Sequence, residues 1–273
     1  MTDPDPAPAD HKQWVAGVFD RAARTYDRVG EPYHDHYGRR LVEVLDPRPT
    51  DALLDVGCGR GAVLVPAAPR VHRLVGVDAS PGMVAAAREE LDRAGAGPVD
   101  LRVMDAESLE FEDASFDAVT CAFTLFFLPR PERAADEFAR VLRPGGRLIV
   151  STWGDDDPRW TFADDLLAAL PVARRPVRRP FDRPEDVRAL LAAAGLADPT
   201  SRREDHEIRF ADADQWWAWH WSFSRRGVLE QLDAAAVDEL RMVSIAAIPD
   251  PLRAAGLPMR LSAWFTSAGA PDR

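Results

Sequence analysis

Residues 51–64 read DALLDVGCGRGAVL, a short apolar run followed at once by glycines at positions 57, 59 and 61. The apolar run has the length of a buried β-strand, and the residues after Gly61 can begin a helix. Glycine has no Cβ, so a glycine turn at the carboxyl end of a strand lets a ligand approach the main chain closely. The stretch therefore predicts a ligand site at the end of the first strand of an α/β sheet.

Apolar runs of strand length alternate with helical stretches after this turn. We expect strands at 73–78, 99–104, 116–123 and 147–153, with helices at 80–94 and 131–142. Ser80 followed by Pro81 is a favourable helix start, because the hydroxyl can cap the helix and proline suits its first position. The alternation predicts a mostly parallel sheet with helices on both faces.

The flanking segments are less regular. Residues 1–10 are rich in Pro, Asp and Ala and are expected to form a disordered tail, followed by amphipathic helices at 11–28 and 32–45. Beyond Gly154 we expect, in order, a helix at 160–170, a Pro/Arg-rich connector to Pro184, a helix at 185–194, a strand at 201–210, a long helical insert at 213–247 and a last strand at 257–266.

Composition limits the partners. The 273-residue chain has a formal net charge of -11, which repels phosphate backbones and anionic membrane surfaces. The short basic runs Arg174–Arg175 and Arg178–Arg179 lie among prolines and are expected to form a solvated loop. No signal peptide and no apolar run of membrane-spanning length are evident, and two cysteines fit a reducing compartment. We expect a cytoplasmic protein without a nucleic-acid or membrane partner.

The glycine turn alone fits two cofactor classes. GCGRGA satisfies the dinucleotide fingerprint G-x-G-x-x-G/A, and Asp78 follows at about the expected distance of ~20 residues, so a NAD-dependent dehydrogenase is one alternative. Asp55, two residues before Gly57, favours a different ligand. A carboxylate there repels a pyrophosphate but attracts a positively charged amine.

Two more carboxylates follow strand candidates. Asp78 ends the run RLVGVD and can accept hydrogen bonds from both hydroxyls of a ribose beside the glycine turn. Asp105, followed by Ala106, can accept a hydrogen bond from the exocyclic amine of an adenine. Met83 is placed to pack against a purine. Carboxylates at three successive strand ends therefore indicate an adenosine-containing ligand that also carries an amine.

Six segments within residues 19–153 carry a family resemblance: in order, FDRAARTYDRV, LLDVGCGRGA, VGVDASPGMV, MDAESLEF, FDAVTCAFTLFFL and RVLRPGGRLIVSTW. Together they resemble the class I S-adenosylmethionine-dependent methyltransferases, within the group that includes the ubiquinone and menaquinone biosynthesis enzymes. The resemblance implies a Rossmann-like, doubly wound α/β sheet of seven strands with the last strand antiparallel. It also implies S-adenosylmethionine as cofactor and S-adenosylhomocysteine as product.

The resemblance carries cofactor roles onto matching positions. Gly57, Cys58 and Gly59 would line the methionine portion with Asp55 near its amine, and Cys121 and Ala122 would offer backbone groups to it. Asp78 would hold the ribose, Ala79 and Met83 would border the adenine, and Asp105 with Ala106 would bind its edge. Tyr26 would close over the cofactor, although a purely structural role for Tyr26 is an alternative.

The acceptor half carries an aromatic segment, ADQWWAWHWSFSRR, in which four tryptophans surround His220. The tryptophans are expected either to lock a helical cap onto the sheet or to wall an aromatic or otherwise apolar acceptor. His220 would then be the general base, with Tyr33 and His36 as competing catalytic candidates. His34, Asp35 and His36 form H-D-H on one helix, a spacing that does not suit a metal pair, so we expect no metal.

These observations predict one domain over 11–273, made of a helical cap (11–48), a cofactor-binding core (49–153) and an acceptor-side half (154–273) with a helical insert at about 212–248. The expected function is transfer of a methyl group to an O, N or C atom of a small, apolar or aromatic molecule, by in-line displacement with a protein general base. A dehydrogenase and a catalytically inactive scaffold are the alternatives, and a monomer or homodimer is expected.

Overall fold

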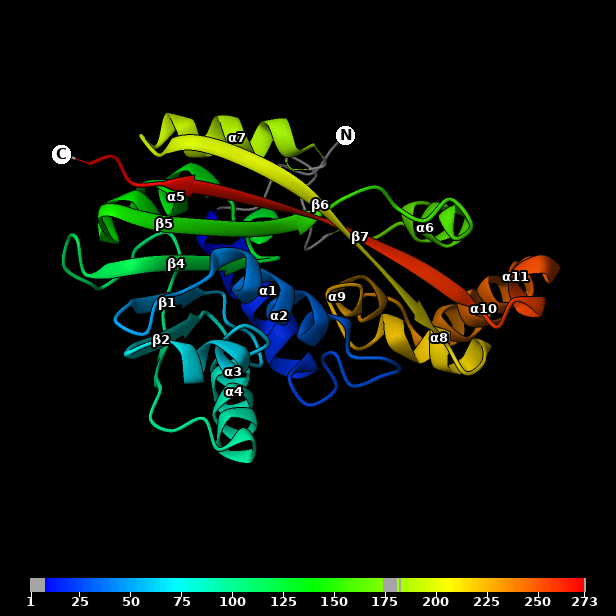
Figure 1. Ribbon diagram of the computed structural model, residues 1–273. Coiled ribbons are helices and arrows are strands. Elements are labelled where there is room, and N and C mark those ends of the chain that lie inside the picture. The colour runs from blue at the N-terminus through cyan, green and yellow to red at the C-terminus, as the bar shows by residue number, and fades with distance from the viewer. Residues whose placement is uncertain (1–7, 174–180, 182, 273) are drawn as a thin grey trace.

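The computed structural model describes residues 8–173, 181 and 183–272, and within them the chain forms a seven-stranded sheet in the order β3-β2-β1-β4-β5-β7-β6 (Figure 1). Strands β1 to β5 are parallel, and β7 lies antiparallel between β5 and β6. The predicted sheet with its antiparallel last strand is therefore confirmed. The strands are β1 (Ala52–Val56), β2 (Arg73–Asp78), β3 (Asp100–Val103), β4 (Phe116–Ala122), β5 (Leu142–Trp153), β6 (Ala197–Arg209) and β7 (Pro258–Gly269).

Helices cover the sheet in two groups that follow from its parallel connections. All five residues of β1 are buried, as expected for a central strand packed on both faces. The first group, α2, α3 and α4, contacts β2, β3 and β5, while α5 and α7 contact one another and the β5–β7 side. The bounds are α2 (Tyr33–Leu45), α3 (Leu64–Ala67), α4 (Pro81–Ala94), α5 (Pro131–Val141) and α7 (Pro184–Ala193), with short 3₁₀ turns at Ala68–Arg70 and Leu125–Phe127.

The N-terminal segment differs from its prediction at both ends. Helix α1 spans Pro8–Ala22, so part of the expected tail is helical, while residues 1–7 lie outside the described residues. The helix ends at Ala22 instead of 28, and the turn that follows includes Asp27, which adopts a left-handed conformation with φ of 53°. Its carboxylate accepts hydrogen bonds from the backbone N–H groups of Tyr33 and His34, each at 3.1 Å. Asp27 thereby caps the first two N–H groups of α2.

The acceptor-side half is carried by β6 and β7, which extend past the other strands to a group of helices at their far end (Figure 1). The predicted insert is helical but divided, because Asp212 and Asp233 cap separate helices through hydrogen bonds to the N–H groups of Gln215 and Ala236. The helices of this half are α6 (Thr161–Ala168), α8 (Ala213–His220), α9 (Arg226–Leu229), α10 (Ala234–Ala246) and α11 (Asp250–Ala254).

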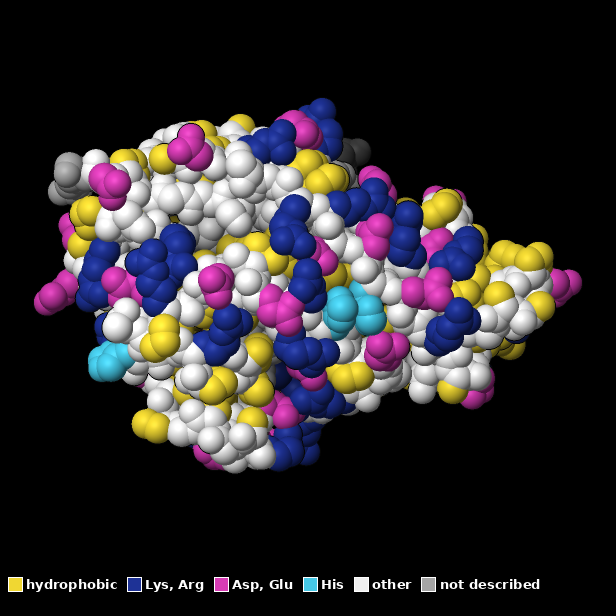
Figure 2. Space-filling view, in the orientation of Figure 1, with side chains coloured by type: hydrophobic (Ala, Val, Ile, Leu, Met, Phe, Trp, Pro, Cys, Tyr) yellow, Lys and Arg dark blue, Asp and Glu magenta, His cyan; other side chains and the backbone are white. Residues whose placement is uncertain are grey.

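The surface agrees with the charge pattern of the sequence. Basic and acidic side chains lie interspersed over the face shown in Figure 2. The basic runs Arg174–Arg175 and Arg178–Arg179, predicted to form a solvated loop, lie outside the described residues. In the part of the chain that the structure describes, every helix is too short or too polar to cross a membrane.

Candidate active site

The glycine turn lies at the carboxyl end of β1, between β2 and β4. Gly57, Gly59 and Gly61 have φ angles of 71°, 51° and 90°, which glycine adopts without strain. A Cβ on Gly57 would lie 2.1 Å from Oγ1 of Thr124, whereas a Cβ on Gly59 would meet nothing within 4 Å. The turn therefore excludes a side chain at 57 because Thr124 packs there, and it leaves open space at 59.

Two cavities with shared walls lie beside this turn. The strand-end cavity, about 580 Å³, lies between α1 and the ends of β2, β3 and β4. The glycine-turn cavity, about 50 Å³, lies between the turn and α2. The predicted cofactor residues that line one or both are Tyr26, Asp55, Gly57, Cys58, Gly59, Asp78, Ala79, Met83, Asp105, Ala106 and Ala122.

Cys121 is the exception among the predicted cofactor residues. It is fully buried inside the sheet, where it pairs in register with Val150 of β5, and it lines neither cavity. Burial raises the pKa of its thiol above the ordinary value. The next two residues along the chain do line both cavities. Ala122 was predicted to do so, and Phe123 was not singled out from the sequence.

Asp55 carries an unsatisfied buried oxygen. Its Oδ1 accepts a hydrogen bond from the Thr120 hydroxyl at 2.7 Å, while its Oδ2 is buried without a partner. Burial raises the pKa of Asp55 to about 7, the Thr120 bond opposes this rise, and the Asp78 charge adds to it. A bound ammonium group would supply both the missing hydrogen bond and the counter-charge.

Asp78 ties the glycine turn to the next helix. Its Oδ2 accepts a hydrogen bond from the Gly59 N–H at 2.9 Å, and its Oδ1 accepts one from the Ser80 N–H at 2.9 Å. Burial raises the pKa of Asp78, and these backbone hydrogen bonds oppose the rise. Ser80 caps α4 as predicted, because its hydroxyl accepts a hydrogen bond from the Met83 N–H. The structural role of Asp78 in the turn was not predicted.

Helix α1 closes the strand-end cavity through a lysine. Lys12 Nζ lies 2.7 Å from Oδ2 of Asp105 and 2.5 Å from Oε2 of Glu107, whose side chain is almost fully buried. Lys12, Ala16 and Phe19 all line this cavity from α1. Their spacing places them on one helix face, which is the signal that could have identified α1 as a wall of the site.

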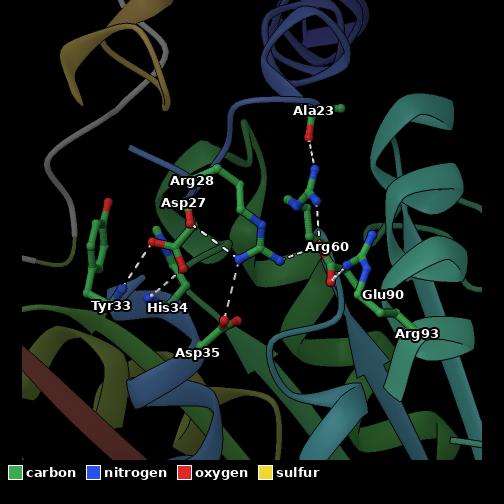
Figure 3. A network of polar contacts seen from close by, with 9 residues as sticks. All are labelled: Ala23, Asp27, Arg28, Tyr33, His34, Asp35, Arg60, Glu90 and Arg93. Carbon is green, nitrogen blue, oxygen red and sulfur yellow. Dashed lines mark hydrogen bonds and ion pairs between the residues drawn. The ribbon is translucent and has the colours of Figure 1, made fainter. Parts of the chain in front are cut away.

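A polar network surrounds the glycine-turn cavity (Figure 3). Arg28 and Arg60 both pair with Glu90 on α4, and Arg28 Nη1 also lies 3.5 Å from Oδ2 of Asp35. Burial favours the neutral form of Glu90, but hydrogen bonds from these arginines hold its pKa below the usual value. Arg28, Arg60 and Asp35 also line the cavity. The network thus places two cations beside the wall that Asp55 makes acidic.

Tyr26 and His34 form a hydrogen-bonded pair at the same cavity. The Tyr26 hydroxyl lies 3.0 Å from Nε2 of His34, and Nδ1 of His34 lies 3.3 Å from Oδ1 of Asp27. Burial raises the pKa of Tyr26 far above its ordinary value, so its hydroxyl stays protonated. The sequence analysis considered His34 only in the H-D-H segment, whose spacing does not suit a metal pair, and did not predict its place in this cavity wall.

Phe123 and Trp153 form an aromatic partition at the ends of β4 and β5. Their rings stack with centroids 4.1 Å apart. Phe123 is buried with φ of 51°, an uncommon conformation for a bulky residue, and its N–H donates to the carbonyl and hydroxyl oxygens of Ser151. Strain of this kind persists only where neighbouring contacts impose it, and it is found most often at functional sites.

Beyond the partition lies a third cavity, the aromatic cavity, of about 310 Å³. Trp153 forms its edge toward the glycine turn, and β7 and the helices α6 and α9 contribute Met259, Leu167 and Val228. Its aromatic wall residues are Tyr33, Trp153, Trp160, Trp219 and Phe223. The partition therefore has the glycine-turn and strand-end cavities on its Phe123 side and the aromatic cavity on its Trp153 side.

Comparison with known proteins identifies the fold and the chemistry of this site. A family model described as a methyltransferase domain matches residues 54–150. The chain is 34% identical over 261 residues to nocamycin O-methyltransferase of Saccharothrix syringae, with 87% of this chain and 93% of that protein covered. The chain belongs to the class I S-adenosylmethionine-dependent methyltransferases.

Further similarities agree with this family. The chain is 35% identical over 144 residues to the ubiquinone/menaquinone biosynthesis C-methyltransferase UbiE of Hydrogenovibrio crunogenus, covering 50% of this chain and 57% of that protein. The crystal structure of the YcgJ protein from Bacillus subtilis shares the fold, with a TM-score of 0.61, 23% identity, and coverage of 87% of this chain and 100% of that one.

The methyltransferase uses S-adenosylmethionine to methylate a small molecule, as its relatives do. The comparisons give no support to the dehydrogenase or to the inactive scaffold. The cavities fit this cofactor on an independent observation: the unpartnered Oδ2 of Asp55 requires a donor, and the cofactor's amine is one.

Of the three predicted catalytic residues, only Tyr33 lies in a cavity wall of the methyltransferase. Its ring lines the aromatic cavity, with centroids 5.9 Å from Trp153 and 6.0 Å from Trp219. Burial raises the pKa of Tyr33 well above its ordinary value. The hydroxyl therefore stays protonated at neutral pH and can donate a hydrogen bond but cannot serve as a base.

The structure argues against His220 as the general base. Its ring is buried and lines none of the three cavities, and both nitrogens are engaged: Nδ1 with the Trp216 carbonyl and Nε2 with Arg225 Nη1, each at 2.9 Å. Burial first, and then the Arg225 charge, lower the pKa of His220 to about 3. An imidazole without a free lone pair facing a ligand cannot accept its proton, so His220 is a packing residue.

The structure also places His36 away from the chemistry. Its ring stacks on His206 with centroids 3.8 Å apart and lines none of the three cavities. Burial and the neighbouring His206 lower its pKa. His36 and His34 point to different faces of α2 because they are two residues apart, and only His34 reaches a cavity wall.

The tryptophans of the insert divide between the two predicted roles. Trp219 lines the aromatic cavity. Trp216 is fully buried against Trp160, with centroids 5.1 Å apart, and so locks α8 onto the body of the domain. Trp217 stacks on His220, and Trp221 lies beneath Arg226. One of the four therefore lines the cavity while the others pack the insert.

Proposed function

We propose that the enzyme transfers the methyl group to an apolar, aromatic molecule bound in the aromatic cavity. The observation that carries this proposal is the partition, a stacked Phe123–Trp153 pair with centroids 4.1 Å apart and a cavity on each side. Cofactor residues predicted from the sequence line one side, and five aromatic rings line the other. A methyl group presented at the partition would be within reach of an acceptor on the Trp153 side.

The predicted cofactor contacts are kept in this proposal, with two additions. Asp55 would hold the amine of the methionine portion, with Gly57, Cys58, Gly59 and Ala122 around it. Asp78 would bind the ribose, Ala79 and Met83 would border the adenine, Asp105 and Ala106 would bind its edge, and Tyr26 would close over it. We add Arg28 and Arg60 for the methionine carboxylate, because both line the glycine-turn cavity.

The cofactor supplies a methyl group on a positively charged sulfur, and the protein's task is to align the acceptor and exclude water. The rings of Tyr26, His34 and Phe123 at the glycine-turn cavity present aromatic faces, which favour a cation. As the methyl group moves, the charge on sulfur is lost. The aromatic cavity therefore has to orient the acceptor more than it has to stabilise a new charge.

An acceptor that carries a proton needs a base, and we propose His34 for this role in place of His220 and His36. Its ring lies 5.5 Å from Phe123 and 6.0 Å from Trp153, centroid to centroid, at the partition itself. Oδ1 of Asp27 lies 3.3 Å from Nδ1, within ion-pair distance of the ring. Nε2 lies 3.0 Å from the Tyr26 hydroxyl, a hydrogen bond that fixes the orientation of the His34 ring beside the partition.

The remaining expectations also stay proposals. The acidic net charge favours a small acceptor over a nucleic acid. The enzyme would act in the cytoplasm as a monomer or homodimer, with Cys58 and Cys121 reduced, as both are free and buried.

The test is methyl transfer from S-adenosylmethionine to a panel of phenols and aryl amines, followed by mass spectrometry for a gain of one methyl group. We expect His34→Asn to lower kcat by about 10²- to 10⁴-fold, the usual contribution of a general base.

His36→Asn is the matched control, because His36 lies on the same helix outside the cavities and should keep full activity. Equal losses in the two variants would contradict the assignment of the base. The absence of any methylated product, in an enzyme that binds the cofactor, would contradict an aromatic acceptor.

A further inference from the structure

The Tyr33 hydroxyl is a hydrogen-bond donor that the protein leaves unused. Tyr33 is the first residue of α2 and is 3% exposed, and its backbone N–H donates to Oδ1 of Asp27 at 3.1 Å. Within residues 8–173, 181 and 183–272, no atom forms a hydrogen bond with the hydroxyl. Burial raises the pKa of Tyr33 well above its ordinary value, so the hydroxyl keeps its proton. A nearly enclosed donor of this kind is matched by a ligand that brings an acceptor atom.

This hydroxyl faces the aromatic cavity. In Figure 3 it points away from the polar network that holds the backbone of Tyr33. Of the three cavities, Tyr33 lines only the aromatic one, together with Trp219 and Arg225. The Tyr33 and Trp219 rings lie 6.0 Å apart between centroids, and Cζ of Arg225 lies 5.8 Å from the Trp219 centroid. Burial dominates the pKa of Tyr33, but the Arg225 charge opposes the rise, so the guanidinium is within electrostatic reach of the hydroxyl.

Neighbouring contacts fix where this donor lies. The two carboxylate oxygens of Asp27 accept hydrogen bonds from the backbone N–H groups of Tyr33 and His34, each at 3.1 Å. The Tyr33 ring packs against His34 and Trp153, with centroids 4.3 Å and 5.9 Å away. A side chain packed on several sides keeps one rotamer. Because Trp153 forms the partition with Phe123, the donor is held on the acceptor side of the partition.

The charged groups of the cavity wall are balanced within the protein. Three of its aspartates form ion pairs: Asp155 with Arg203 at 3.1 Å, Asp157 with Arg159 at 2.6 Å, and Asp164 with Arg225. Asp156 is exposed at the rim, where solvent screens its charge. Arg260 lies opposite Glu207 in the sheet register, three residues from the Ala263 partner of Trp153, and so points to the other face of the sheet. The described wall therefore recognises an acceptor through apolar rings and a neutral donor, not through a net charge.

The chemical class of the acceptor follows from this wall. A phenol or an aryl amine that is to be methylated brings a donor of its own, whereas the Tyr33 hydroxyl needs an oxygen that accepts. A carbonyl oxygen accepts a hydrogen bond and carries no proton, so a single donor is enough to satisfy it in an aromatic cavity. A carboxylate also accepts, but burying its charge without a counter-charge is far less favourable.

We infer that the acceptor is an uncharged aryl carbonyl compound, and that Tyr33 selects it by donating a hydrogen bond to its carbonyl oxygen on the Trp153 side of the partition. This inference rests on the proposed function and adds the class of acceptor and the residue that recognises it. Tyr33 transfers no proton in this role. Its hydrogen bond sets the orientation in which the acceptor meets the methyl group.

The experiment is calorimetric titration of the enzyme saturated with S-adenosylhomocysteine, using para-hydroxyacetophenone and para-ethylphenol. Both probes are phenols with a two-carbon side chain, and only the first carries a carbonyl oxygen. In Tyr33→Phe the affinity for para-hydroxyacetophenone, relative to that for para-ethylphenol, should fall by about 3- to 10-fold, the usual value of one net hydrogen bond. The ratio cancels any general effect of the substitution on the cavity.

Tyr37→Phe is the matched control. It removes a hydroxyl from the same helix that donates to the Leu261 carbonyl at 2.7 Å, and Tyr37 lines none of the three cavities, so the affinity ratio should not change. A second measurement is the infrared stretching frequency of the bound carbonyl group, which a hydrogen bond lowers. This frequency should rise in Tyr33→Phe and stay at the wild-type value in Tyr37→Phe.

Each variant is checked first for S-adenosylhomocysteine binding, which shows that it is folded. An affinity ratio or a carbonyl frequency that is the same in Tyr33→Phe and the wild type would overturn the inference, as would failure of both probes to bind. In the wild type alone, a bound carbonyl that absorbs as it does in an alkane solvent would also overturn it. The proposed function fails on a different result, namely that no phenol or aryl amine gains a methyl group.

Discussion

The two halves of the site are complementary to opposite kinds of ligand group. On the cofactor side the unsatisfied buried atom is an acceptor, Oδ2 of Asp55, at the end of a central strand. On the side of the aromatic cavity the unsatisfied atoms belong to groups that can donate, the indole N–H of Trp219, the hydroxyl of Ser262 and Nε of Arg260. The cofactor half is built by strand ends and a glycine turn, whereas the proposed acceptor half is built by side chains from several distant segments, the insert among them. Backbone topology therefore determines the first half, and side-chain packing determines the second.

The largest effect is expected where the backbone itself forms the site. In Gly57→Ala the new Cβ would lie 2.1 Å from Thr124 Oγ1, at a φ of 71°. Overpacking and backbone strain together should cost roughly 2 to 6 kcal/mol in the free energy of unfolding. The turn would also move, so S-adenosylhomocysteine affinity should fall by about 100-fold or more, measured by calorimetry.

Gly95→Ala is the control for strain alone. Gly95 ends α4 with φ of 64°, and a Cβ there would meet nothing within 4 Å. Its cost should be about 1 to 2 kcal/mol, with cofactor affinity unchanged. If both variants bound the cofactor like the wild type, the close packing of the glycine turn would not be what forms the cofactor site.

A smaller, pH-dependent effect is expected at Asp55. Because burial raises its pKa to about 7, the carboxyl group is protonated below that pH and must lose its proton to bind an ammonium group. S-adenosylhomocysteine affinity should therefore fall by about tenfold per pH unit below 7 and level off above it. The free protein should show the opposite sign, losing stability as the pH rises from the ordinary value of 3.8 toward 7.

Asp55→Asn sharpens this prediction, because it keeps the shape of the side chain and removes the titration. The affinity of this variant should be low and nearly independent of pH between about 6 and about 8, roughly 1 unit on either side of the raised pKa. A wild-type profile that is flat over this interval would mean that Asp55 does not contact the cofactor's amine.

The sequence predicts the cofactor half well because its pattern is local. Asp55 is the last residue but one of β1, Asp78 ends β2 and Asp105 lies two residues beyond β3, and parallel strands bring their carboxyl ends to one edge. The same reasoning missed Lys12 and the Asp78–Gly59 hydrogen bond, since both join segments that are distant in the chain. Cys121, expected to offer backbone groups to the cofactor, lines neither cavity, and this expectation stays a prediction.

The acceptor half is less predictable for a physical reason. The identity of His220 suggested a base, but its burial and its contact with Arg225 depend on how α8 packs against α9 and α6. Likewise, H-D-H on α2 does not say which histidine faces the glycine turn.

The claim that one cavity binds the cofactor and the other binds the acceptor can be tested most directly with a matched pair of phenylalanines. Phe127 is partly buried and lines the strand-end cavity, and Phe223 is partly buried and lines the aromatic cavity. Calorimetry would give the affinities of Phe127→Ala and Phe223→Ala for S-adenosylhomocysteine and, with that ligand bound, for para-hydroxyacetophenone.

We predict that Phe127→Ala lowers the affinity for S-adenosylhomocysteine by roughly tenfold, the value of one lost ring contact, and leaves the affinity for the acceptor-side ligand within about twofold of the wild-type value. Phe223→Ala should do the reverse. If each variant weakened both ligands equally, or if Phe223→Ala affected only S-adenosylhomocysteine, the two cavities would not be separate cofactor and acceptor sites.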